Sequence, residues 1–99
     1  MIKIYNGEKI EELTKEGIWI VDFYADWCGP CKILLQNLEA LKDNINIIKI
    51  NVDDYKDIAI NFGVMSIPTL ILFKEGNNIK ETIGYKSLEE LEEFIKESI

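Results

Sequence analysis

The sequence predicts an α/β protein with a central mixed β-sheet of four to five strands, flanked by helices on both faces. Two apolar segments, residues 18–25 and 45–52, are rich in Ile, Val and aromatic residues and are typical of strands covered on both sides. Between them, leucines at helical spacing predict an amphipathic helix over residues 29–43, which crosses over between two parallel strands. A third apolar strand, residues 69–73, is followed by a strand over residues 79–83, and the two should pair as an antiparallel hairpin.

The remaining elements lie at the chain ends and between these strands. Residues 2–5 predict a short strand and residues 8–15 a short helix. A second crossover runs through residues 55–62, and residues 75–78 provide the turn of the hairpin. The final helix is predicted by a capping box and an apolar face, which are made by Ser87 and Glu90 and by Leu88, Leu91, Phe94 and Ile95.

Length and composition indicate one domain over residues 1–99. The chain is long enough for a single core, and 47% apolar with 29% charged residues is an ordinary globular balance. The net charge is -7 and the 11 basic residues are lysines spread along the chain, so we expect no nucleic-acid partner and no anionic membrane. No apolar run approaches a signal peptide or the roughly 18 residues that span a bilayer, which favours a cytoplasmic protein.

The two cysteines, Cys28 and Cys31, follow a predicted buried strand and open a predicted helix. Pro30 suits the first helical turn, where its missing N–H has no partner, and Gly29 lets the backbone turn tightly. An offset of three within a helical turn brings the sulfurs close enough for a disulfide. A permanent structural disulfide is not expected in a reducing compartment, so the pair predicts redox chemistry.

The two sulfurs are expected to differ in role. Cys28 lies at the helix N-terminus, where free N–H groups and the helix dipole stabilise a thiolate, so we predict it as an exposed nucleophile. Cys31 falls on the apolar stripe of the helix and is predicted as the shielded, resolving thiol. A zinc site is the first alternative, but zinc needs about four ligands and the chain has no His and no further Cys. Two inert buried thiols are the second, against which Trp27 and the intervening Gly-Pro argue.

Residues 21–32, Val-Asp-Phe-Tyr-Ala-Asp-Trp-Cys-Gly-Pro-Cys-Lys, resemble the active-site segment of the thioredoxin family. Residues 67–69, Ile-Pro-Thr, residues 74–76, Lys-Glu-Gly, and Gly84 are similar to the family's pattern at similar spacing. The resemblance implies the thioredoxin fold, protein-disulfide reductase activity without a bound cofactor or metal, and a cis peptide before Pro68. An ordinary trans turn proline is the alternative at that position. The resemblance also implies a substrate-binding surface made of Trp27, Gly29, Pro30, Ile67, Pro68 and Gly84.

Asp22 interrupts the most apolar strand, where a carboxylate is costly unless it is paired or protonated. Lys49 interrupts the neighbouring strand in the same way, and strand alternation lets the two side chains approach each other. We therefore hypothesise that Lys49 is the partner of Asp22, and the resemblance implies that Asp22 shuttles the proton that activates Cys31 and has a raised pKa. A structural ion pair without a catalytic part is the alternative.

Several nearby residues depart from the family pattern or invite a second interpretation. Tyr24 stands where many members carry a second Trp, and Gln36 where many carry a Pro. Asp26 either disfavours the Cys28 thiolate or faces water, and we favour water. The adjacent Asp53 and Asp54 resemble a metal or acid–base pair, but two acids at a strand end are more often turn formers.

The partners implied by the resemblance are proteins with disulfides and a flavin-containing thioredoxin reductase that supplies electrons, and we expect a monomer. An oxidase or isomerase is one rival function, which would normally carry an export signal and work in an oxidising compartment. A redox-silent binding module that uses the surface around Trp27, Ile67 and Gly84 is the rival from another class.

Overall fold

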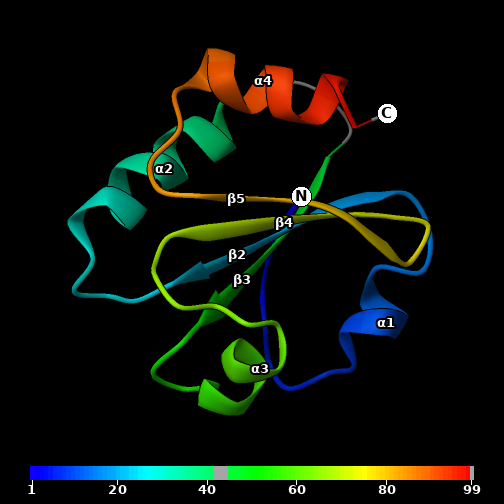
Figure 1. Ribbon diagram of the computed structural model, residues 1–99, viewed down its shortest axis with the longest axis vertical. Helices are drawn as coiled ribbons and strands as arrows, with labels where there is room; N and C mark the ends of the chain where they lie inside the picture. The colour runs from blue at the N-terminus through cyan, green and yellow to red at the C-terminus, as the bar shows by residue number, and fades with distance from the viewer. Residues whose placement is uncertain (42–44, 99) are drawn as a thin grey trace.

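The computed structural model describes residues 1–41 and 45–98, which form a five-stranded mixed sheet in the order β1-β3-β2-β4-β5 (Figure 1). The first three strands are parallel, β4 runs antiparallel to β2, and β5 antiparallel to β4. The predicted central strands and hairpin are therefore confirmed. The elements are β1 (Ile2–Ile4), α1 (Ile10–Leu13), β2 (Ile18–Tyr24), α2 (Gly29–Glu39), β3 (Asn46–Asn51), α3 (Lys56–Asn61), β4 (Thr69–Lys74), β5 (Asn77–Ile83) and α4 (Leu88–Lys96).

The sheet carries an apolar core on each face, which explains why its inner strands are apolar without alternation. Figure 1 shows α2 and α4 on one side of the sheet and α1 and α3 on the other. In β2, Val21 and Phe23 belong to the cluster beneath α1 and α3, whereas Ile20 belongs to the cluster beneath α2 and α4. Because successive residues of a strand face opposite sides, Asp22 lies on the same face as Ile20 and is directed toward α2 and α4.

The helix α2 ends earlier than its sequence pattern indicates. We predicted it over residues 29–43, but it ends at Glu39 with Ala40 as its C-cap, and the N–H of Leu41 donates to the carbonyl of Leu38. The prediction for residues 40 and 41 is therefore wrong. The apolar stripe continues to Leu41, but the N–H of Leu41 bonds to the residue three positions back, as in the tighter last turn at the end of a helix. The predicted residues 42 and 43 lie outside the described residues.

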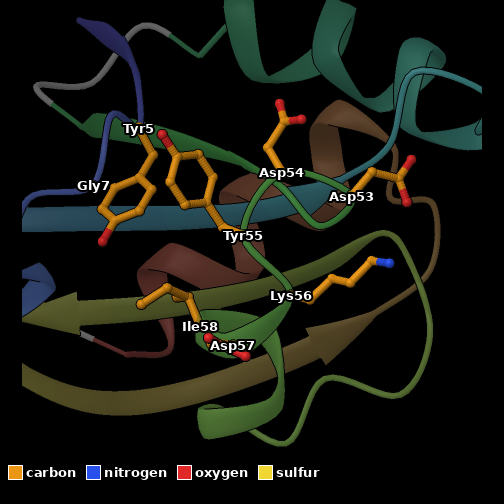
Figure 2. Close-up of a pocket in the computed structure, with 8 residues that line it drawn as sticks. All are labelled: Tyr5, Gly7, Asp53, Asp54, Tyr55, Lys56, Asp57 and Ile58. Carbon is orange, nitrogen blue, oxygen red and sulfur yellow. The ribbon is translucent and has the colours of Figure 1, made fainter.

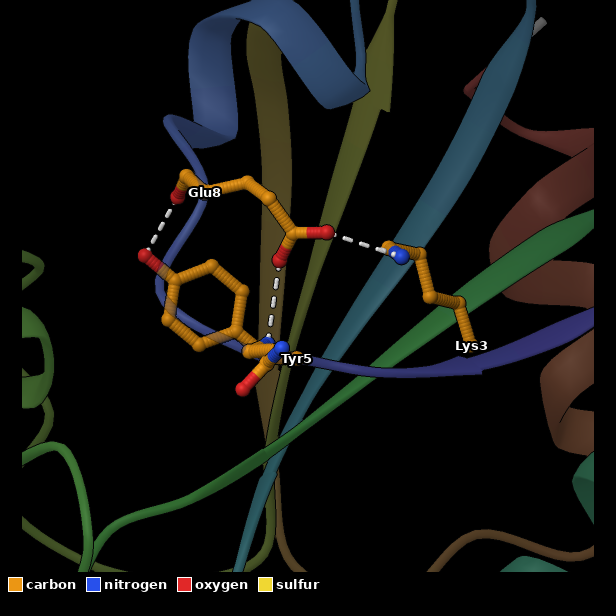
Figure 3. Close-up of polar contacts among 4 residues, drawn as sticks. Lys3, Tyr5 and Glu8 are labelled. Carbon is orange, nitrogen blue, oxygen red and sulfur yellow. Dashed lines mark hydrogen bonds and ion pairs between the residues drawn. The ribbon is translucent and has the colours of Figure 1, made fainter.

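The first helix is also shorter than its predicted range of 8–15. Figure 3 shows why it does not begin at Glu8, whose carboxylate turns back onto the preceding loop. That carboxylate accepts the N–H of Asn6 at 3.0 Å and pairs with the Lys3 ammonium at 2.8 Å, while the Glu8 carbonyl accepts the Tyr5 hydroxyl. At the other end the Thr14 hydroxyl donates to a carbonyl of the same turn and closes the helix.

Two turn signals of the second half of the chain are reproduced in detail. The hairpin turns through Glu75 and Gly76, both with positive φ, as a two-residue turn that suits the twist of paired strands requires. The second strand of the hairpin consequently starts at Asn77, two residues before the predicted start. The capping box of Ser87 and Glu90 is confirmed, with both reciprocal hydrogen bonds present.

Candidate active site

The two cysteines form a disulfide where β2 gives way to α2. Cys28 is the N-cap of α2, Pro30 lies in the first turn, and the Cα atoms of Cys28 and Cys31 are 5.3 Å apart. The Cys28 N–H donates to the carbonyl of Ala25 at 3.2 Å, and this hydrogen bond closes the turn between β2 and α2. The sequence prediction that a helical turn brings these sulfurs together is confirmed.

Exposure does not distinguish the two sulfurs, contrary to our expectation of an exposed Cys28. In the disulfide, Cys28 is 5% exposed and Cys31 4%, because Ile67, Val52 and Tyr24 pack around the pair. The difference between them lies in hydrogen bonding. The backbone N–H of Cys31 donates to the Sγ atom of Cys28 at 3.2 Å, so one of the free donors at the start of the helix is directed at the first sulfur.

The loop before β4 lies against the disulfide. The peptide bond between Ile67 and Pro68 is cis, as the resemblance implies, and Pro68 is buried while Ile67 contacts the cysteine pair. The N–H of Gly84 donates to the carbonyl of Pro68 at 2.8 Å. The structure thus brings Ile67, Pro68 and Gly84 to one place, although Gly84 is remote from the other two in sequence.

A cavity of about 400 Å³ lies beside the disulfide, and its lining is mostly apolar. Its lining includes Trp27, which is 71% exposed, Ile67, and Met65, which is 96% exposed. The cavity is lined by Trp27, Val52, Ala59, Val64, Met65, Ser66 and Ile67. Gly29 and Pro30, which lie between the two buried cysteines at the start of α2, are exposed.

Asp53 is the residue of this site that the sequence analysis missed. Its carboxylate accepts the indole N–H of Trp27 at 2.9 Å, and its own N–H donates to the side chain of Asn51 at 2.9 Å. The turn interpretation of Asp53 and Asp54 is therefore confirmed, but the same turn also orients the Trp27 wall of the cavity. No local signal could have revealed this, because the hydrogen bond joins residues 26 positions apart.

The acidic residues around α3 do not converge on one point. Figure 2 shows Asp53, Asp54 and Asp57 around a cavity of about 490 Å³, with their carboxylates directed away from one another. Within the ranges 1–41 and 45–98, the structure contains no group of three side chains placed to hold a metal ion.

Asp22 is fully buried, and within the described part of the chain neither of its carboxylate oxygens has a hydrogen-bond partner. Burial raises the pKa of this carboxyl from its ordinary 3.8 to about 7, against a smaller opposing effect of the Lys49 charge. Lys49 is its direct partner in the register of the two strands, as strand alternation predicts. The expected side-chain contact is absent, however, since the Lys49 Nζ atom lies 4.1 Å from the centroid of the Tyr24 ring.

A second, smaller cavity of about 80 Å³ is lined by residues from both the disulfide and the neighbouring strands, and Asp22 is not among them. Its lining includes Cys31, Lys49, Tyr24 and the exposed Asp26, so the second sulfur and the lysine face the same small space. A cavity of this size has room for water.

A disulfide at the start of a helix, with an apolar cavity beside it, is the arrangement of a thiol–disulfide oxidoreductase. The exchange takes place at Cys28 and Cys31. The chain belongs to the thioredoxin family, whose family model, described as Thioredoxin, matches residues 2–97. The family implies disulfide-bearing protein substrates and a reductase partner.

Individual relatives agree with this assignment over the full chain. The chain is 40% identical to the thioredoxin of Chlamydia caviae over 100 aligned residues, which cover 98% of each chain. It is 38% identical to the thioredoxin of Listeria monocytogenes over 103 aligned residues, which cover 100% of each. A solved thioredoxin variant from Halobacterium salinarum superposes with a TM-score of 0.91 at 32% identity, covering 98% of this chain and 89% of that chain.

None of the helices in the described ranges is long and apolar enough to cross a membrane.

Proposed function

We propose that the chain reduces disulfides in other proteins, with Cys28 as nucleophile and Cys31 as resolving thiol. The Cys28 thiolate attacks one sulfur of the target disulfide, and the second target sulfur leaves as a thiolate. The Cys31 thiolate then attacks the Cys28 sulfur, the first target sulfur leaves, and the Cys28–Cys31 disulfide forms. Two electrons pass from the chain to the target. This assignment of roles is supported by the hydrogen bond that the Cys31 N–H donates to the Cys28 sulfur, because a donor at that sulfur stabilises the Cys28 thiolate.

Asp22 is the proton acceptor for Cys31 in this proposal. A group is an effective general base when its pKa lies near the working pH, and burial brings the pKa of Asp22 to about 7. The carboxyl lies on the sheet face that is covered by α2, which carries Cys31. Lys49 modulates this proton transfer through its charge.

The surface around the disulfide is the proposed site for the target chain. Trp27 and Ile67 line the apolar cavity, Pro68 follows Ile67 and is hydrogen-bonded to Gly84, and Gly29 and Pro30 are exposed between the two cysteines. An extended target segment next to its own disulfide fits such a groove. The oxidised chain is re-reduced by a flavin-containing thioredoxin reductase, and it works as a cytoplasmic monomer.

Trapping tests the proposed roles of the two sulfurs. With Cys31→Ser, the mixed disulfide at Cys28 is not resolved, so reaction with a model protein such as reducible insulin should accumulate a covalent complex. The matched control is Cys28→Ser, which should trap little. Equal trapping by both variants would overturn the assignment of roles.

A double Cys28→Ser, Cys31→Ser variant separates the reductase from a redox-silent binding module. The reductase loses all disulfide reduction in this variant, whereas a binding module keeps its biological activity. An isomerase or oxidase is excluded if the parent protein reduces insulin faster than it reactivates scrambled ribonuclease.

A further inference from the structure

Lys49 has two groups within its reach, and the structure shows it at only one of them. Asp22 is its register partner across the strand pair, and Tyr24 lies two residues further along β2 on the same face. The Lys49 ammonium lies over the ring of Tyr24, while the Asp22 carboxyl has no hydrogen-bond partner in the described ranges. The lysine is therefore held beside the acid without being bonded to it.

We propose that Tyr24 is a positioning residue for the proton-transfer site, because its aromatic face holds the Lys49 ammonium away from the Asp22 carboxyl and at the wall of the cavity beside Cys31. This inference rests on the proposed proton-accepting role of Asp22 and adds the group that keeps the acid unpaired.

Solvation explains why the Lys49 ammonium lies over the Tyr24 ring and not at the Asp22 carboxyl. Tyr24 and Lys49 are both half-buried, so an ammonium over the ring keeps part of its water while it interacts with the aromatic face. Movement onto Asp22, which is fully buried, would remove that water and would also require an ionised carboxylate in the core. Without the ring, the ammonium loses its alternative partner and the carboxylate becomes the strongest attraction within its reach.

The other charged groups around this site do not replace Lys49. Burial raises the pKa of the Tyr24 hydroxyl, and the negative charges of Asp26, Asp22 and Asp54 raise it further. From β4 the residue paired with Asp22 is Leu70, which carries no charge. From α2 the cavity receives Cys31 and the exposed Lys32.

The titration of the Asp22 carboxyl tests the proposal in the intact oxidised chain, by 13C NMR of the side-chain carboxyl. Tyr24→Leu removes the ring, and we expect the midpoint of Asp22 to move to lower pH by about one pH unit, because Lys49 then approaches the carboxylate. Tyr24→Phe keeps the ring and is the matched control, with an unchanged midpoint. Tyr24→Met serves the same comparison if Tyr24→Leu does not fold.

The Lys49→Met background distinguishes a released lysine from a more hydrated core. In this background Tyr24→Leu should leave the midpoint of Asp22 where Lys49→Met alone puts it. A midpoint that moves equally in both backgrounds overturns the proposal, and so does a midpoint that does not move when the ring is removed. This titration does not depend on catalysis, so unchanged turnover in Asp22→Asn would refute the proton-accepting role while the positioning of Lys49 is still decided by NMR.

Discussion

Two carboxylates, Glu8 in the loop before α1 and Asp22 in the centre of the sheet, show how opposite surroundings give opposite protonation behaviour. The Glu8 carboxylate has a lysine partner and backbone donors (Figure 3), chiefly Lys3, and these lower its pKa. Asp22 has a lysine as register partner but no bond to it, and burial raises its pKa. A carboxylate that is satisfied holds structure, whereas one that is buried and unsatisfied is available to exchange a proton.

The largest expected effect is on the pH dependence of stability. Between its ordinary pKa of 3.8 and the folded-state pKa of about 7, Asp22 keeps a proton in the folded chain that the unfolded chain releases. The contribution of Asp22 to the free energy of unfolding therefore falls as the pH rises through this range, by roughly 4 kcal/mol, and is level above about pH 7. Urea unfolding of the parent and Asp22→Asn across this range measures the difference, and parallel curves would contradict it.

Removal of the carboxyl should have the next largest effect, on the rate of resolution. Asp22→Asn keeps the size of the side chain but cannot accept the Cys31 proton, so resolution at pH 7 should slow by on the order of a hundredfold. Stopped-flow measurement of target release from a preformed Cys28 mixed disulfide isolates this step. The matched control is Glu8→Gln, which changes the other carboxylate and should leave the rate unaltered. An unaltered rate in Asp22→Asn across pH would refute the role.

A smaller effect is expected from the Trp27–Asp53 hydrogen bond, which is exposed. Asp53→Ala frees the indole, and KM for a protein disulfide should rise about threefold to tenfold with little change in kcat. Asp53→Asn retains an oxygen acceptor for the indole N–H and should resemble the parent. Steady-state insulin reduction compares the three proteins, and a loss of kcat in Asp53→Ala would show that the residue does more than orient Trp27.

The smallest effect should come from the satisfied carboxylate. Its partner Lys3 is partly exposed, and exposed ion pairs contribute little, so Lys3→Met should lower Tm by no more than about two or three degrees. Thermal unfolding monitored by circular dichroism at low and high salt measures this. A decrease in Tm much larger than this would show that the loop before α1 contributes more to the stability of the fold than its exposure indicates.

The sequence was most informative where a residue breaks a pattern. Asp22 and Lys49 were identifiable because each is a charge within an apolar strand, and the register of β2 with β3 places them opposite each other. The strand predicted over residues 18–25 ends within one residue of its predicted end, at Tyr24, because its continuous apolar run marks a strand covered on both faces. The cis bond at Pro68 came from the family resemblance, since no physical pattern in the chain distinguishes it from a trans proline.

The sequence was least informative where structure depends on partners that are distant along the chain. The Lys49 ammonium could reach either Asp22 or Tyr24, and only the packed structure decides between them. Asp53 has the pattern of a turn former, and its bond to Trp27 requires the ends of two strands to be adjacent. The end of α2 at Glu39 was missed because Leu41 continues the stripe without continuing the helix.

The alternation of β2 gives its register a chemical meaning. Ile20 and Asp22 face α2, while Val21 and Phe23 face α1 and α3. A shift of this strand by a single position would exchange the two sets, placing a valine under the sulfurs and an acid among the aromatic rings of the opposite core. The face on which Asp22 lies thus depends on the strand register alone. A one-residue insertion early in β2 would move its carboxyl to the opposite face of the sheet from α2, although both Asp22 and Cys31 would still be present.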